Sequence, residues 1–271
     1  MKKMIGVLLL LPICLCKAQT GARVLNFNKG DAFEKKTIIT SSCRLRQGGQ
    51  AMNVTSSSVV TKLYTVNNVL NNGFQFNVTT SQVTDTINGM GQQFIYHADG
   101  PVDTGSVIQT AIRNIVNIPV SVVVNNRGII TSGGNVPAQQ GSDIIMSYSG
   151  LQPVQYNKGD ELDLAAGFVY NPLFTKGFSW TDSSTANGNK TIVTYTIQSI
   201  GDGVTGVSFE GTVIENNFTT NITGVLMVDN ATGIINQKMQ QTASTGYNVL
   251  NGVAYTEERR TSLSEYCIKK Q

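Results

Sequence analysis

Short runs in which apolar and polar residues alternate dominate this chain and predict β-strands. In residues 74–78, a phenylalanine or valine stands at every second position, so the apolar side chains share one face of an extended strand. Residues 191–197 repeat the pattern, with Val193, Tyr195 and Ile197 alternating with threonines. Strands with one apolar and one polar face are typical of antiparallel sheets that cover a core on one side.

Glycine- and asparagine-rich turns separate these runs, and Asn-Gly pairs in particular are typical of tight β-hairpins. The pattern between the turns predicts long strands over residues 31–46, 51–66, 73–87, 190–200, 204–214, 219–228, 233–245 and 247–268. We therefore expect an all-β or β-dominated α+β fold. In such a fold, long antiparallel strands would form one curved sheet or two related half-sheets.

One stretch, about 104–116, has the periodicity of an amphipathic helix instead. Its apolar residues recur in pairs every four positions, and Asp103 or Thr104 can cap its start while Pro119 follows its end. The apolar stripe consists of Val107, Ile108, Ala111, Ile112, Ile115 and Val116. A second, shorter helix is predicted over 137–150. The stripe must be buried against something, so it either lines an apolar ligand cavity on the concave face of the sheet or completes the core.

The first 18 residues have the pattern of a secretory signal peptide. Lys2 and Lys3 precede an apolar run over 4–15, and Ala18 is a small residue at a cleavage position before Gln19. The apolar run is too short to span a bilayer. We expect a protein that is exported to the periplasm or cell envelope, with no transmembrane span in the mature chain.

Two cysteines near the predicted cleavage position raise the alternative of a lipoprotein. Lipid attachment needs a small residue before the cysteine, but Ile13 precedes Cys14 and Leu15 precedes Cys16. The sequence therefore favours simple cleavage over lipid anchoring.

Removal of the signal peptide changes the charge balance. The whole chain has 20 basic and 17 acidic residues, and loss of Lys2, Lys3 and Lys17 leaves 17 of each. A neutral mature chain lacks the basic surface that nucleic acids require, so we expect no nucleic-acid partner.

After removal of the signal peptide, Cys43 and Cys267 are the remaining cysteines. In an oxidising compartment they either form a disulfide or stay apart as buried thiols, and the sequence leaves both alternatives open.

The sequence offers little catalytic chemistry. His97 is the only histidine, so a serine or cysteine triad would have to use it. It ends a predicted strand, where a hydrogen-bonded or exposed histidine is far commoner than a catalytic one. Residues 201–206 fit the dinucleotide-binding pattern G-x-G-x-x-G, but a strand follows where the motif needs a helix, which predicts a hairpin turn. Asp160, Glu161 and Asp163 match no EF-hand loop and indicate a solvated acidic turn. We expect no catalytic residue, no cofactor and no metal.

Two motifs occur twice in the same order and indicate an internal duplication. Residues 27–33 resemble 174–180, and residues 124–130 resemble 228–235. Trp180 takes the place of Phe33 and is predicted to be a core residue. The predicted organisation is a signal peptide over 1–18, a first β-rich half with the helix over 19–150, a connector over 151–176 and a second β-rich half over 177–271. The alternative is that the two halves form one domain.

These motifs also resemble a domain-of-unknown-function family of exported proteins from Gram-negative, Bacteroidetes-type bacteria. The resemblance rests on Asn28-Lys29-Gly30-Asp31, on Pro172 with Lys176-Gly177-Phe178-Ser179-Trp180, and on Val228-Asp229 with Thr232-Gly233. Members of that family usually have an acidic or small residue where Phe178 stands. The resemblance implies export and a duplicated β-rich fold, and it implies no activity and no functional residues.

Three classes of function fit these observations. The first is a non-catalytic envelope protein that binds an apolar or lipid-like ligand. The second is a structural or interaction component that binds an envelope protein or a glycan through its β surface. The third is a carboxylate-dependent hydrolase. A non-catalytic role is favoured, because the sequence contains no recognisable catalytic constellation.

Overall fold

A computed structural model of the protein describes residues 25–100, 107–134, 155–166, 174–186, 189–215, 217–250 and 253–270. It confirms the predicted all-β fold, since twelve antiparallel strands form one sheet. The predicted signal peptide and the predicted helix over 137–150 lie outside the described residues.

The strands follow the hairpin turns closely, and most are long. They are β1 (Ala32–Gln47), β2 (Gln50–Leu70), β3 (Gly73–Gly89), β4 (Gln92–His97), β5 (Pro119–Asn125), β6 (Ile130–Gly133), β7 (Ser179–Ala186), β8 (Asn189–Ile200), β9 (Val204–Ile214), β10 (Phe218–Asp229), β11 (Ile235–Leu250) and β12 (Val253–Lys270). The turn between β8 and β9 occupies residues 201–203 of the glycine pattern, and β9 begins with the rest of it. The Gly201 amide donates to the Val204 carbonyl, as a hairpin requires.

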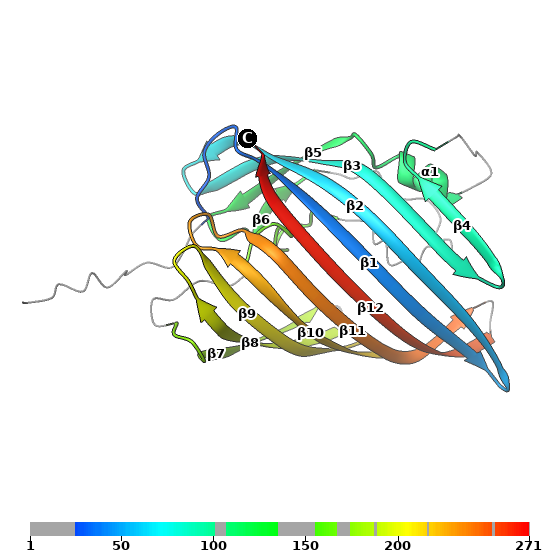
Figure 1. Ribbon diagram of the computed structural model, residues 1–271. Helices are drawn as coiled ribbons and strands as arrows, with labels where there is room; N and C mark the ends of the chain where they lie inside the picture. Colours follow the sequence, from blue (N-terminus) through cyan, green and yellow to red (C-terminus); the bar gives the residue numbers. More distant parts are fainter. Residues whose placement is uncertain are drawn as a thin grey trace, which may run out of the picture.

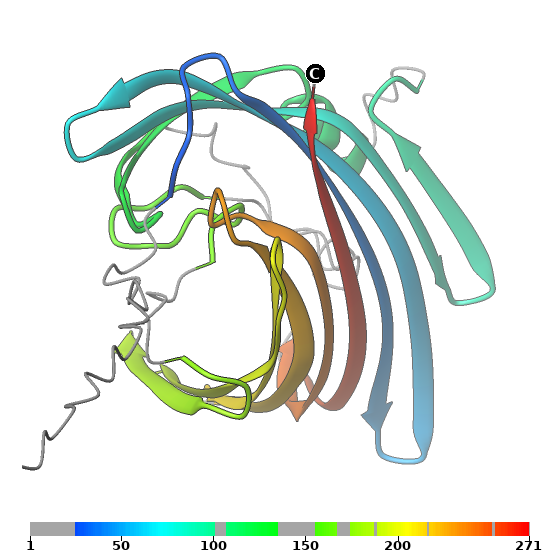
Figure 2. The same ribbon diagram turned by 60° about the vertical axis from the view of Figure 1, so that its left-hand side comes forward.

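The first and last strands meet in the middle of the sheet. The strand order is β6-β5-β3-β2-β1-β12-β11-β10-β9-β8-β7, and β4 pairs with β3 outside this path. Residues 32–46 of β1 pair with residues 270–256 of β12. The sheet is open and strongly curved, with β1 and β12 side by side at its centre (Figures 1 and 2).

Alternation along the strands separates a concave face from an outer face. In β1, the side chains of Phe33, Lys35, Cys43 and Leu45 are buried, while their neighbours in sequence are more exposed. The connector over 155–166 packs on the same face through Leu162 and Leu164, and it lies inside the curve of the sheet (Figure 2). The odd-numbered residues of β1 therefore point to the concave side.

Three hydrophobic clusters lie on the concave face. The first joins β1, β2, β3 and β5 to the connector and to residues 25–28, where the Phe27 ring lies edge-on to three phenylalanines at centroid distances of 5.0–5.5 Å. The second lies under the helix, and the third lies between β8, β9 and β10. Their fully buried members include Phe33, Tyr64, Phe76, Leu45, Ile87, Ile112, Ile130, Leu162, Leu164 and Ile197.

The predicted helix over 104–116 is present but shorter. Helix α1 covers Val107–Arg113. It ends early because Val116 forms a β-bridge with Thr80 and Asn117 has a φ of 60°, which is incompatible with a right-handed helix. Ile112, Ile115 and Val116 belong to the second hydrophobic cluster.

The predicted break between the last two long strands was wrong by several residues. The prediction placed it at Gly246, but β11 continues to Leu250 and β12 begins at Val253. Gly246 lies within β11. A Cβ there would come within 2.1 Å of the Asn217 carbonyl oxygen and 2.6 Å of the Phe218 ring, so the position requires a glycine. This glycine permits a close approach of neighbouring backbone and does not form a turn.

The two copies of the Phe-x-Lys-Gly motif form the same turn. Gly30 has a φ of 91° and Gly177 a φ of 88°. The Gly30 amide donates to the Val66 carbonyl at 2.8 Å, and the Gly177 amide donates to the Ile197 carbonyl at 2.8 Å. In both halves a register shift follows directly in the partner strand.

The connector binds the two copies of the second motif in the same way. Gly128 and Gly233 have φ values of 80° and 79°. The Leu162 amide donates to the Gly128 carbonyl, and the Ala166 amide donates to the Gly233 carbonyl. The connector therefore links a turn of the first half to the equivalent turn of the second. Duplication itself stays a prediction, which these equivalent contacts support.

Candidate functional site

The concave face presents its side chains in rows that cross the sheet. Each row follows the pairing register from strand to strand, so its members are direct cross-strand neighbours. The central row consists of Tyr96, Asp85, Ser58, Ile39, Leu263, Gln240, Gly224, Phe209, Tyr195 and Trp180. The adjoining row contains Ile87, Ser56, Ser41, Thr261, Thr242, Ile222, Gly211, Val193 and Asp182.

Part of these two rows is only half buried. We call this part the half-exposed belt, and it mixes apolar side chains with small polar ones. It consists of Ile39, Leu263, Thr261, Gln240, Thr242, Ile222 and Val193. The belt lies on the same face as the three buried clusters, so inward-facing apolar side chains remain accessible at the middle of the concave face.

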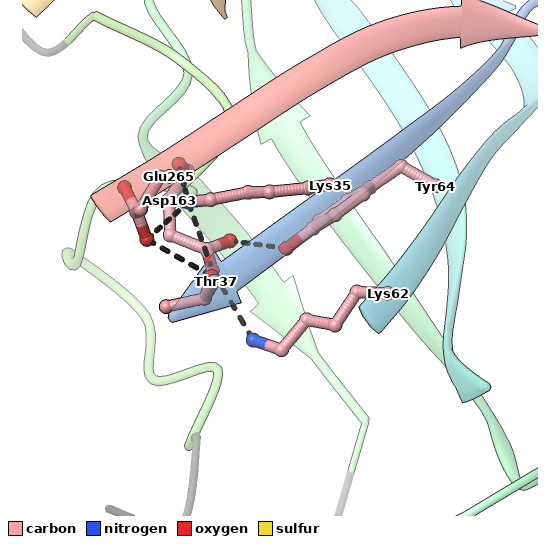
Figure 3. Close-up of polar contacts among 6 residues, drawn as sticks. All are labelled: Lys35, Thr37, Lys62, Tyr64, Asp163 and Glu265. Carbon is pink, nitrogen blue, oxygen red and sulfur yellow. Dashed lines mark hydrogen bonds and ion pairs between the residues drawn. The ribbon is translucent and has the colours of Figure 1, made fainter. Parts of the chain in front are cut away.

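A charged cluster lies next to the belt and connects the sheet to the connector (Figure 3). Lys62 on β2 lies 3.1 Å from Asp163 of the connector, and Lys35 on β1 lies 3.5 Å from the same carboxylate. The Lys35 ammonium also lies 2.9 Å from Glu265 on β12. The Tyr64 hydroxyl donates to Asp163 at 2.8 Å.

Electrostatics keep Asp163 charged. Burial acts to raise the pKa of this carboxyl group, but the charges of Lys35 and Lys62 and the hydrogen bond from Tyr64 outweigh it and hold the pKa well below its usual range. The two lysine side chains are almost fully buried, with exposed fractions of 3% and 9%. The cluster therefore anchors the connector to the sheet.

The prediction of a solvated acidic turn at Asp160, Glu161 and Asp163 was wrong for Asp163. Asp163 is part of the anchor, whereas Glu161 is exposed. A signal for the anchor was present, because alternation from Phe33 places Lys35 on the buried face of its strand. The partner of that lysine could not be found from sequence, since the connector has no periodic pattern.

Of the two alternatives that the sequence left open for the cysteines, the structure has two separate buried thiols and no disulfide between them. Both Cys43 and Cys267 are free and buried. Because Cys267 lies opposite Lys35 in the pairing of β1 with β12, the two sulfur atoms are separated by about 27 Å along the strands. Burial is the main reason that the pKa of each thiol rises to about 11.

The predicted ligand-lining stripe is divided. Ile112 is 1% exposed in the second cluster, and Ile115 and Val116 pack against that cluster. The side chains of Val107, Ile108 and Ala111 lie outside the described residues. The stripe's use as a ligand lining stays a prediction, and Ile112 itself completes a core.

An aromatic column crosses β7, β8 and β9. The Trp180 ring stacks between Phe174, at a centroid distance of 4.9 Å, and Tyr195, at 5.2 Å. Phe209 follows 6.1 Å beyond Tyr195. Trp180 packs against the third hydrophobic cluster, so its predicted place in the core agrees with its surroundings.

One buried carboxyl group of the central row has an unusual environment. Asp85 is 0% exposed, and the Ser58 hydroxyl donates to its Oδ1 atom at 2.7 Å. Among the described residues, its Oδ2 atom has no hydrogen-bond partner. Burial is the dominant cause that raises the pKa of Asp85 to about 6, against the lowering effects of Ser58 and the Thr86 amide.

Two observations about candidate metal and catalytic residues concern the described part of the chain. It contains no group of three or more His, Cys, Asp or Glu side chains that could hold a metal ion. His97 is exposed at the end of β4. Among the described residues, no helix is long and apolar enough to cross a bilayer.

The sequence matches no protein-family model and no curated protein. Among solved structures, the chain is similar to lipovitellin, in a structure that concerns lipid–protein interactions, with a TM-score of 0.52 and 12% identity over 91% of this chain. The chain spans 26% of the lipovitellin chain. At this identity the similarity shows a shared fold alone.

Two outer-membrane proteins have lower similarity. An outer membrane channel from Pseudomonas putida F1 has a TM-score of 0.27 with 7% identity, over 90% of this chain and 98% of the channel. OccK5 from Pseudomonas aeruginosa has a TM-score of 0.23 with 7% identity, over 90% of this chain and 99% of OccK5. Scores this low support no conclusion about this chain.

Proposed function

We propose that this protein is an exported, non-catalytic protein of the cell envelope that binds an apolar or lipid-like ligand against the concave face of its sheet. The observation that carries the proposal is the half-exposed belt. Apolar side chains on the face of a sheet that covers the core are normally buried, yet Ile39, Leu263 and Ile222 lie on that face and remain partly accessible. An apolar ligand would remove this surface from water.

The composition of the belt also fits this class of ligand. Charged side chains of the concave face border the belt on both sides, with Lys35 and Glu265 on one side and Arg259 and Glu257 on the other. The polar members of the belt itself are hydroxyl and amide groups that can satisfy one another or a ligand's polar atoms. The shared fold with lipovitellin adds support, because that structure concerns lipid–protein interactions. The signal-peptide pattern supports the proposed location.

Native mass spectrometry of the protein purified from its own cell envelope tests the proposal. We expect an additional mass that organic extraction removes and identifies as an apolar compound. Ile222→Trp fills the belt and should abolish the additional mass. Thr223→Trp is the matched control, since Thr223 is the exposed neighbour on the same strand and points to the outer face.

The proposal would be contradicted if the wild-type protein carried no apolar compound after gentle purification. Equal retention by Ile222→Trp and the wild type would also contradict it, provided that circular dichroism shows the same strand content in both.

A further inference from the structure

Lys238 lies at the margin of the half-exposed belt, on the side of the charged cluster that contains Glu265. On the concave face it is directly opposite Glu265 of β12 and Leu226 of β10, and the next inward residue of its own strand is Gln240 of the belt. Its ammonium nitrogen lies 5.9 Å from the centroid of the Phe209 ring. The side chain is half buried, with its charge next to apolar and aromatic surface.

The nearest carboxylates already have partners. Glu265 lies 2.9 Å from the Lys35 ammonium, and Asp163 interacts with both Lys35 and Lys62. Within the part of the chain that the structure describes, Lys238 forms neither a hydrogen bond nor an ion pair. Glu161, which is exposed, lies beyond ion-pair distance of it.

The surroundings of Lys238 disfavour its charge. Burial is the largest effect on the pKa of this ammonium group and lowers it. The carboxylates of Glu265, Asp163 and Glu161 act in the opposite direction, while Lys35 adds to the lowering. The net result is a lowered pKa, so the described carboxylates do not fully compensate the desolvated charge. An anion brought close to the ammonium would supply the missing compensation.

We infer that Lys238 binds the anionic headgroup of the ligand, a carboxylate or a phosphate, while the apolar chain of the ligand lies along the half-exposed belt. The inference rests on the proposed function and specifies its ligand as an anionic amphiphile. The cation and the apolar surface are adjacent in the pairing register, so a single elongated molecule can contact both.

Binding of matched pairs of lipids tests the inference. Oleic acid and methyl oleate share a chain and differ in charge, and lysophosphatidic acid and monoolein provide the same comparison for a phosphate. We expect the wild-type protein to bind each anion roughly tenfold or more tightly than its neutral counterpart, as for a hydrogen bond to a charged group. Lys238→Met should remove this preference and leave the affinity for the neutral lipids unchanged.

Two further variants serve as controls. Lys238→Arg keeps the charge and should keep the preference for anions. Lys36→Met removes a lysine from the exposed outer face of β1 and should change nothing. The lipid whose preference is larger in the wild type, oleic acid or lysophosphatidic acid, identifies the headgroup as a carboxylate or a phosphate.

A preference for anions that survives in Lys238→Met overturns this inference and leaves the proposed function standing. Equal affinity of the wild type for neutral and anionic lipids would also overturn the inference and leave the proposed function standing. Failure of the wild type to bind all four lipids contradicts both the inference and the proposed function.

Discussion

Asp163 is the residue through which the connector is fixed to the sheet. It contacts two lysines on adjacent strands and accepts a hydrogen bond from Tyr64. Lys35 keeps Glu265 as a partner if Asp163 is lost, whereas Lys62 keeps no other carboxylate within the described residues. The anchor is therefore most sensitive to the carboxylate that both lysines share.

Asp163→Asn should lower the free energy of unfolding by about 2–3 kcal/mol, because it leaves a buried ammonium unpaired. The value is below that of a fully buried pair, since the Asp163 side chain is 37% exposed. Chemical denaturation at neutral pH measures the change. Glu34→Gln, which breaks an exposed ion pair with Lys270, is the control and should cost less than about 1 kcal/mol. Equal effects of the two substitutions would show that the anchor is not structural.

Asp85 makes the stability of the folded protein fall as the pH rises. Burial raises the pKa of Asp85 in the folded protein from the ordinary value of 3.8 to about 6, so the folded state binds a proton more tightly than the unfolded state. The stability that protonation provides is present below pH 4 and is lost as the pH rises through 6. At about 1.4 kcal/mol for each pKa unit, the loss between these limits is roughly 2–3 kcal/mol.

Asp85→Asn should therefore stabilise the protein at pH 8 relative to the wild type and have little effect at pH 4. Thermal unfolding at the two pH values measures the difference. Asp202→Asn, in the exposed turn between β8 and β9, is the control and should leave the pH profile unchanged. A shift of the same size at pH 4 and pH 8 would contradict the assignment of the titration to Asp85.

Little of this could be read from sequence at the scale of residues. Alternation places Lys35 and Asp85 on the buried face of their strands, but it does not reveal their partners. Asp163 lies in a connector with no periodicity, and Ser58 is one of three consecutive serines. Pairing register, which the sequence does not specify, decides that Ser58 meets Asp85 and that Cys43 lies far from Cys267.

At the scale of elements, the long strands were predictable because turn residues and alternation agree. The predicted strand over 73–87 corresponds to β3, and the predicted strand over 204–214 corresponds to β9. The short strands β4, β5, β6 and β7 were not among the predicted long strands, because a run of few residues gives a weak periodic signal. The helix was predicted to extend too far because Val116, the last residue of the predicted stripe, forms a β-bridge with Thr80 of β3.

Helix α1 should stabilise the sheet through Ile112. Ile112→Ala should cost about 2–4 kcal/mol, since the side chain is 1% exposed in the second hydrophobic cluster. Thr110→Ala is the control on the same helix, and it should change stability by less than about 0.5 kcal/mol because Thr110 is exposed. Urea denaturation distinguishes the two. A negligible effect of Ile112→Ala would mean that the helix does not hold its cluster together.

At the scale of the whole molecule, the connector binds two glycine turns from different halves of the chain. Gly128 has little space, since a Cβ there would lie 2.5 Å from the Ala165 Cβ and 3.4 Å from Leu25. Gly30 has a similar positive φ, but a Cβ there would meet no atom within 4 Å. The two positions therefore share backbone strain and differ only in contact with the connector.

Gly30→Ala should cost about 1 kcal/mol from its positive φ alone. Gly128→Ala should cost about 1–3 kcal/mol more, because the added methyl group displaces the connector. Limited proteolysis should also cut the connector faster in Gly128→Ala than in Gly30→Ala. Equal stability and equal cleavage rates in the two variants would show that the connector does not depend on this contact.

The position of β12 between β1 and β11 also determines the order in which the molecule can be completed. Glu34 and Lys270 form an ion pair although they lie 236 residues apart in sequence. Before β12 pairs, the preceding strands can form only two separate meanders, and β1 and β11 are then long unpaired edges that can associate with other chains. Contacts so distant in sequence form slowly. The final strand therefore both joins the meanders and covers the edges of β1 and β11, so these two long edges are protected only once β12 has paired.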